Sequence, residues 1–120
     1  LKTLSSDEDG YVDVYEGSAY RRDSSYHQGI TWPWLLGLYY DALKNTMIIE
    51  KNRTKRQELE EKITKLVYTT KETFKAEMFE RSSIGTISEI YDSTEPYEER
   101  GAFAQAWSVA EIFRIVLNKR

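Results

Sequence analysis

The most regular pattern in the chain runs through residues 54–79, TKRQELEEKITKLVYTTKETFKAEMF. Apolar side chains recur every three or four residues there and form one stripe, while the opposite face is charged. The stripe consists of Leu59, Ile63, Leu66, Val67, Phe74 and Met78. This pattern predicts an outer helix from about Thr54 to Phe79 with one covered face, and we assign it no chemistry.

Two other segments have helical spacing with apolar residues over most of the circumference. The first should begin near Thr31, which can cap a first turn before Pro33, and should end near Lys44 or extend to Ile49. The second covers Ala102 to about Asn118. Helices that are apolar nearly all round are usually buried between neighbours, so both are predicted to be inner helices.

The remaining segments are predicted to be loops. Residues 1–25 are rich in turn formers, with one short alternating strand at Tyr11–Tyr15, and residues 80–100 form a second loop. The predicted fold class is therefore all-α with long irregular loops. Two inner helices need more cover than one outer helix provides, so the chain either self-associates or forms a sector of a larger helical toroid.

Composition excludes several classes of protein. The 120 residues suffice for one small domain, and the formal net charge of -3 gives no field that attracts nucleic acid or anionic lipid. No apolar run is long enough to span a membrane, and no leader pattern opens the chain. Cysteine is absent, which fits a reducing cytoplasm. The leading residue is leucine, which suggests a processed chain or a piece of a longer one.

A candidate site begins with residues 85–92, GTISEIYD. Glu89 lies there between apolar and aromatic residues, in a loop bounded by helices, and a loop held by a rigid scaffold often carries function. We interpret Glu89 as a catalytic carboxylate of a sugar-cleaving site. Taken alone, these eight residues favour the plainer interpretation of Glu89 as an ordinary solvated acid, and the residues elsewhere in the chain change that balance.

Polar and aromatic residues also gather where the two inner helices begin. Before and at the first start are Tyr26, His27, Gln28, Trp32 and Trp34; near the second are Glu89, Tyr91, Gln105 and Trp107. If the two helices are parallel, both groups meet at one end and suit a neutral polyhydroxylated ligand, because rings stack on sugars and amides bond hydroxyls. Each residue also has a structural interpretation: His27 as a packing residue, the tryptophans as core anchors, Gln105 as a cap.

Four blocks carry a resemblance to a known family: LKTLS (1–5), YHQGITWPWL (26–35), GTISEIYD (85–92) and RGAFAQAWSVAE (100–111). Together they resemble the C-terminal end of glycogen debranching enzymes, in their amylo-alpha-1,6-glucosidase domain. The resemblance implies an (α/α)6 toroid, of which residues 1–120 supply the last three helices as an incomplete C-terminal segment. It also implies a cytoplasmic enzyme that removes α-1,6-linked glucose from glycogen or a branched α-glucan with inversion.

By position, the resemblance makes Glu89 the general base. An inverting reaction also needs an acid at roughly 6.5–9.5 Å, which in the family is an aspartate upstream of this segment, and neither Asp23 nor Asp92 matches it. Substrate contacts are implied for Tyr26, His27, Gln28, Trp32, Trp34 and Tyr91, with Gln105 and Trp107 also supporting the loop. Residues Ile30 and Thr31 depart conservatively from the expected Thr-Val order.

No cofactor or metal is predicted, since His27 is the single histidine. The partners are the glucan and the remainder of the glucosidase domain, and the segment alone should be inactive and able to self-associate. Two alternatives stay open: a carbohydrate-binding module descended from such a domain without catalysis, and a purely structural helical dimer.

Overall fold

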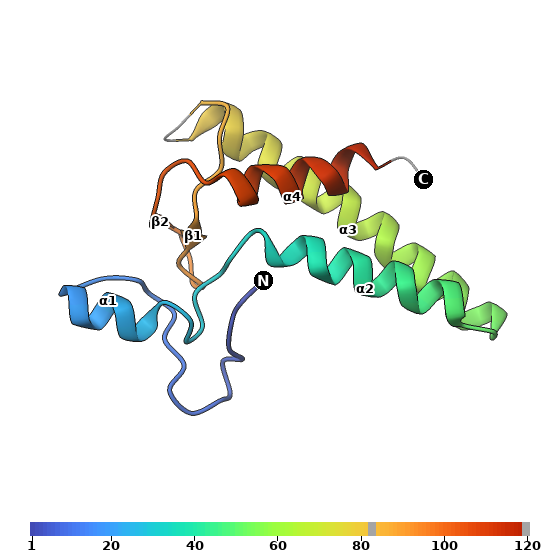
Figure 1. The fold of residues 1–120 in the computed structure, drawn as a ribbon, viewed down its shortest axis with the longest axis horizontal. Coiled ribbons are helices and arrows are strands. Elements are labelled where there is room, and N and C mark those ends of the chain that lie inside the picture. Colours follow the sequence, from blue (N-terminus) through green and yellow to red (C-terminus); the bar gives the residue numbers. More distant parts are fainter. Residues whose placement is uncertain (82–83, 119–120) are drawn as a thin grey trace.

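The computed structural model describes residues 1–81 and 84–118. In this part the elements are α1 (Ala19–Ser25), α2 (Leu35–Ile49), α3 (Arg53–Glu80), β1 (Ile90–Tyr91), β2 (Glu99–Arg100) and α4 (Ala106–Leu117). The all-α class is confirmed. Helices α2, α3 and α4 pack against one another, and the loops, α1 and the short strands gather at the end where α2 and α4 begin (Figure 1). No helix in the described ranges is long and apolar enough to cross a membrane.

The outer helix is predicted almost to the residue. Helix α3 begins one residue before Thr54 and ends one after Phe79, and the Asn52 side chain caps it by accepting a hydrogen bond from the Lys55 amide at 3.1 Å. Of its apolar stripe, Phe74 is buried in a core cluster with Ile87, Tyr91 and Ile112.

The predicted starts of both inner helices are wrong by about four residues. Helix α2 begins at Leu35, because the Thr31 amide and carbonyl are both bonded to the backbone of Tyr91, at 3.0 and 2.9 Å. Helix α4 begins at Ala106, because the Ala102 carbonyl accepts a bond from the Glu89 amide at 2.8 Å. Backbone groups bonded to another segment are not available for a first helical turn.

The first loop also differs from the prediction. Residues Ala19–Ser25 form α1, capped by the Ser18 side chain, where an irregular chain was expected. Residues 11–15 form no strand, because their backbone bonds go to four separate sites: the Glu8 carbonyl, the Gln28 carbonyl, the Asp92 side chain and the Ser93 amide. In the second loop, β1 pairs antiparallel with β2, with Ile90 opposite Arg100.

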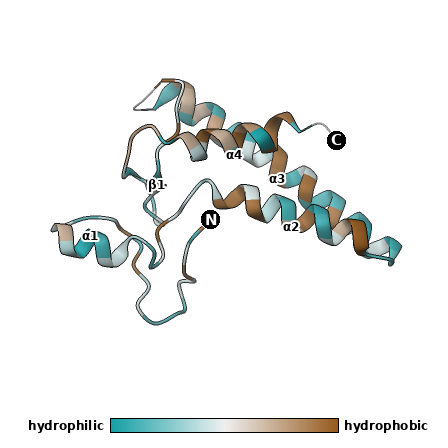
Figure 2. Cartoon of the chain, viewed as in Figure 1, coloured by the Kyte–Doolittle hydropathy of each residue, from teal (hydrophilic) through white to brown (hydrophobic). Residues whose placement is uncertain are grey.

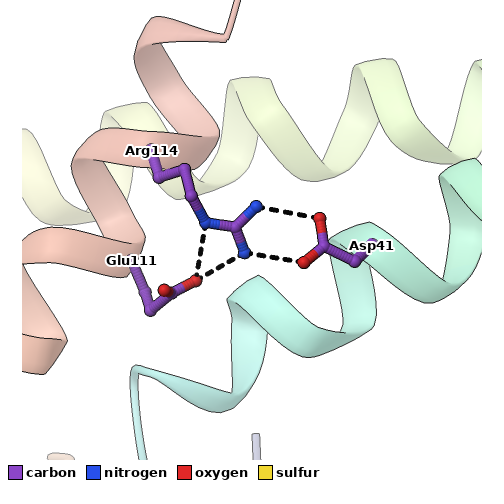
Figure 3. A network of polar contacts seen from close by, with 3 residues as sticks. All are labelled: Asp41, Glu111 and Arg114. Atoms are coloured by element: carbon purple, nitrogen blue, oxygen red, sulfur yellow. Dashed lines mark hydrogen bonds and ion pairs between the residues drawn. The ribbon is translucent and has the colours of Figure 1, made fainter.

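Helices α2 and α4 run parallel. Trp34 stacks on Trp107 where the two helices start. Seven residues later on each helix, Asp41 accepts two hydrogen bonds from Arg114, at 2.8 and 3.0 Å (Figure 3). Between these levels Gly37 faces Glu111: a Cβ on Gly37 would lie 1.7 Å from a Glu111 carboxylate oxygen. Glycine is therefore what lets the two helices approach this closely.

The inner helices are less buried than predicted. On α2, Leu38, Tyr39, Ile48 and Ile49 are exposed, and on α4 Trp107, Phe113 and Leu117 are exposed. Figure 2 shows brown, hydrophobic stretches along both α2 and α4. The outward faces of both helices are uncovered because none of the other described elements packs against them.

Candidate functional site

The Glu89 carboxylate is held by three donors from two other parts of the chain. The Tyr26 hydroxyl donates to Oε1, the Gln105 side-chain amide donates to the same oxygen at 3.4 Å, and the Ala102 amide donates to Oε2 at 3.0 Å. Each contact uses a Glu89 oxygen as an acceptor, which suits an ionised carboxylate. The side chain is half-buried, so it is both fixed and accessible.

Gly101 allows this arrangement. Its φ is +69°, and a Cβ there would lie 2.4 Å from Oε2 of Glu89. Any larger residue would therefore displace the carboxylate or the loop that follows β2.

Tyr26 is fixed as a hydrogen-bond donor. Burial raises the pKa of its hydroxyl, and the hydrogen bond to Glu89 raises this pKa further. The phenol therefore stays protonated at neutral pH. It can orient the carboxylate without competing for a proton.

A continuous aromatic wall stands beside Glu89. The His27 ring stacks on Trp32 with 5.1 Å between the ring centroids and 13° between the planes. Trp32 makes edge-to-face contacts with Tyr26 and Trp107, at centroid distances of 4.7 and 6.1 Å. Trp34 stacks on Trp107 at 5.4 Å. The Trp32 indole is 3% exposed and donates to the Tyr26 carbonyl at 3.0 Å, so the wall is anchored in the core. Flat apolar faces with polar edges suit a sugar ring.

The wall and the carboxylate enclose one pocket of about 220 Å³, lined by Thr3, Tyr26, His27, Trp32, Trp34, Leu35, Glu89 and Trp107. Pockets for drug-sized ligands span roughly 300–1,000 Å³. This one suits a single small ring.

The structure brings most of the predicted site residues together. The aromatic residues Tyr26, Trp32, Trp34 and Trp107 line the pocket with His27 and Glu89, and Gln105 bonds Glu89 from its rim. The two predicted groups of residues therefore meet where the parallel helices α2 and α4 begin.

Two predicted residues lie elsewhere. The exposed Gln28 is outside the pocket lining, although its backbone holds Val12 and Ser25. Tyr91 is buried on the far side of β1, where its hydroxyl donates to Glu77 at 2.7 Å.

Sequence reasoning missed Thr3 and Leu35. Thr3 accepts from the Gly29 amide at 3.0 Å and so holds the turn after His27. Their one signal was membership of the blocks LKTLS and YHQGITWPWL, because a lone threonine in an irregular segment carries no pattern.

No second carboxylate joins the pocket within residues 1–81 and 84–118. Asp92 is buried and accepts two hydrogen bonds from Arg100, and Asp23 is an exposed residue of α1. The same part of the chain contains no group of three metal-binding side chains. The pocket can thus supply one carboxylate and a ring-binding surface.

Of three comparisons with known proteins, one gave a match. Searches among curated proteins and among solved structures gave no match. A family model described as Amylo-alpha-1,6-glucosidase matches residues 1–114, which include every residue that lines the pocket. The predicted resemblance is confirmed, and the chain belongs to the amylo-alpha-1,6-glucosidase family.

Proposed function

We propose that the chain is the C-terminal segment of a glycogen-debranching amylo-alpha-1,6-glucosidase and that Glu89 is its general base. The observation that carries the proposal is a half-buried carboxylate, fixed by three donors, facing a pocket walled by tryptophan rings. In a family that hydrolyses glucosidic bonds, such a carboxylate suits the general base, which is one of the two carboxyl groups that an inverting reaction needs. Helices α2, α3 and α4 would be the last three of an (α/α)6 toroid, whose other helices cover the exposed faces of α2 and α4.

The reaction then proceeds in one displacement. The terminal α-1,6-linked glucose lies against the aromatic wall. Glu89 takes a proton from a water molecule while the oxygen of that water bonds to C1 of the glucose. The bond between C1 and the glucan oxygen breaks, and an acid from the remainder of the domain protonates that oxygen. The products are β-glucose and the shortened glucan, and they form in the cytoplasm.

The first experiment replaces the base in the longer glucosidase that contains the chain, called here the parent protein. Glu89→Gln keeps the side-chain shape but cannot accept the proton, so glucose release should fall about 10³-fold. The matched control is Glu72→Gln on the exposed face of α3, which should leave the rate unchanged. Activity within tenfold of the unmodified protein in Glu89→Gln would refute the assignment.

Azide tests the stereochemistry. In Glu89→Ala, azide ion can enter the vacated space and bond directly to C1 of α-glucosyl fluoride, while fluoride leaves without needing a proton. The proposal requires rescue of the reaction with β-glucosyl azide as product, identified by its anomeric proton coupling in NMR. An α-configured azide would contradict an inverting base at this position.

The chain on its own should release no glucose from a branched limit dextrin, because its pocket holds one carboxylate. A purified 120-residue chain that binds the dextrin without hydrolysis fits both the proposal and a non-catalytic carbohydrate-binding module. The parent protein distinguishes the two hypotheses. If the segment is only a binding module, replacing Glu89 should leave turnover unchanged, whereas a general base predicts its loss.

A further inference from the structure

Helix α3, which the sequence marked as a plain outer helix, sends one carboxylate into the interior. Glu77 is 8% exposed, and its Oε1 accepts a hydrogen bond from the Tyr91 hydroxyl at 2.7 Å. The same hydroxyl accepts the Ser88 amide at 3.3 Å. Two hydrogen bonds in series, through the Tyr91 hydroxyl, therefore link α3 to Ser88, the residue directly before Glu89.

The rest of the segment around Glu89 is bonded to other parts of the fold. The Glu89 amide donates to the Ala102 carbonyl at 2.8 Å, and Tyr91 exchanges two backbone bonds with Thr31. The Tyr91 ring packs in the cluster formed with Phe74, Ile87 and Ile112. These contacts hold the segment in the sheet and the core, but Glu77 is what fixes the hydroxyl of Tyr91.

The charge of Glu77 has a second partner toward the surface. Arg81 lies 3.5 Å from Glu77 and 3.3 Å from Glu99. A buried carboxylate is costly unless it is hydrogen-bonded or paired, and an amide or apolar residue would complete this core with less penalty. A carboxylate whose hydroxyl partner reaches the peptide before Glu89 is therefore better explained by its use as a strong acceptor than by stability.

We propose that Glu77 and Tyr91 are positioning residues for the catalytic base: the contact between them ties the peptide that carries Glu89 to helix α3. The inference rests on the proposed role of Glu89. Neither residue lines the pocket, so loss of the contact should move the base without changing the surface that binds the sugar. Catalysis is sensitive to such shifts, because a misplacement of about 1 Å can cost roughly 10²-fold in rate.

The test uses the parent protein and begins with Tyr91→Phe, which keeps the ring and removes only the hydroxyl. We expect kcat to fall about tenfold, less than for a full 1 Å shift, with KM unchanged. Tyr68→Phe is the matched control: it removes a hydroxyl from an exposed tyrosine of α3 and should change neither constant. Assays at a temperature well below the unfolding midpoint of every variant separate rate from stability.

Variants at Glu77 test the same contact from the other side. Glu77→Gln retains an acceptor oxygen for Tyr91 and should keep most of kcat, whereas Glu77→Leu should match Tyr91→Phe. The double variant Tyr91→Phe with Glu77→Leu should be no slower than either single one, because both remove one contact. If Tyr91→Phe does not fold, the difference between Gln and Leu at position 77 decides the question.

Three results would overturn the inference. An unchanged kcat with a lowered unfolding midpoint makes the contact purely structural. A raised KM with unchanged kcat makes Tyr91 a substrate contact, as the sequence predicted. Full activity in Glu89→Gln removes the base itself and the proposed function with it, whereas an inactive Glu89→Gln with a fully active Tyr91→Phe removes only the positioning role.

Discussion

Two arginine–aspartate pairs in this chain have the same hydrogen-bond lengths and opposite surroundings. Arg100 donates two hydrogen bonds to Asp92 and Arg114 donates two to Asp41, in each case at 2.8 and 3.0 Å. The Asp92 side chain is 4% exposed, whereas that of Asp41 is 46% exposed. The first pair lies in the loop that carries Glu89, and the second joins α2 to α4 (Figure 3).

The difference shows that distance alone does not measure what an ion pair contributes. An exposed pair replaces bonds to water and is screened by salt, so its net value is small. A buried carboxylate that loses its partner keeps a charge that water cannot reach. Asp92 also accepts the Tyr15 amide at 2.8 Å, so it fixes two loops at once. The candidate site is therefore held by buried polar contacts, and the helices by apolar packing.

Removal of the buried partner should have the largest effect on stability. Arg100→Met leaves Asp92 buried and unpaired, and we expect a loss of about 3 kcal/mol in the free energy of unfolding. Urea denaturation of the chain measures it. Arg100→Lys keeps the charge and should lose less, and a loss below about 1 kcal/mol in Arg100→Met would show that the two pairs are energetically alike.

The pH dependence of Glu77 should give a smaller effect, because Tyr91 and Arg81 offset part of its burial. Burial raises the pKa of Glu77 above its ordinary 4.5, and a hydrogen bond with Glu99 adds to the rise. The folded state therefore keeps this proton to higher pH than the unfolded chain. Stability contributed by Glu77 falls as pH rises from 4.5 through the raised pKa of the folded state.

Glu77→Gln removes that decline, because glutamine does not titrate. The measurement is the difference in unfolding free energy between the unmodified chain and the variant, followed from pH 4 upward. As pH rises, the Glu77→Gln variant should become more stable relative to the unmodified chain. Glu72→Gln, at an exposed position of the same helix, should show no change in relative stability with pH. If the relative stability of Glu77→Gln also does not change with pH, the pKa of Glu77 in the unmodified chain is not raised by folding.

The exposed pair should give the smallest effect. Arg114→Met removes the bonds to Asp41 and Glu111, and we expect a loss of at most about 1 kcal/mol at low salt. Most of that loss should vanish in 1 M NaCl, where the Debye length is about 3 Å. A loss equal to that of Arg100→Met, or one that salt does not reduce, would contradict the comparison.

Periodicity predicted the helices and failed at their ends. The stripe in α3 was sufficient to place both of its ends within one residue. At Thr31 and Ala102 the local sequence permits a helix, but bonds to Tyr91 and Glu89 take the backbone groups that a first turn needs. Such bonds join residues far apart in sequence, so no local pattern reports them.

Most of the candidate site was predicted from motif blocks and from the position of the helix starts, and the exceptions have a geometric cause. Tyr91 lies two residues from Glu89, and the motif suggested that both face the sugar. The backbone bends at Glu89, so the two side chains reach opposite sides of the segment: Glu89 meets Tyr26, and Tyr91 meets Glu77. The direction of such a bend depends on the partners that it contacts, which a single sequence does not name.

The contacts in and around the pocket join residues that are distant in the chain. Tyr26 and Glu89 are 63 positions apart, Thr31 and Ser93 are 62 apart, and Tyr15 and Asp92 are 77 apart. Closing loops of this length costs entropy before any contact repays it, so such contacts form slowly compared with a helix. During synthesis, a ribosome that has reached residue 88 has already made α1, α2 and α3 but none of the base. The pocket around Glu89 therefore forms late compared with the helices, and a premature stop codon at residue 89 would yield α1, α2 and α3 without the carboxylate that faces the pocket.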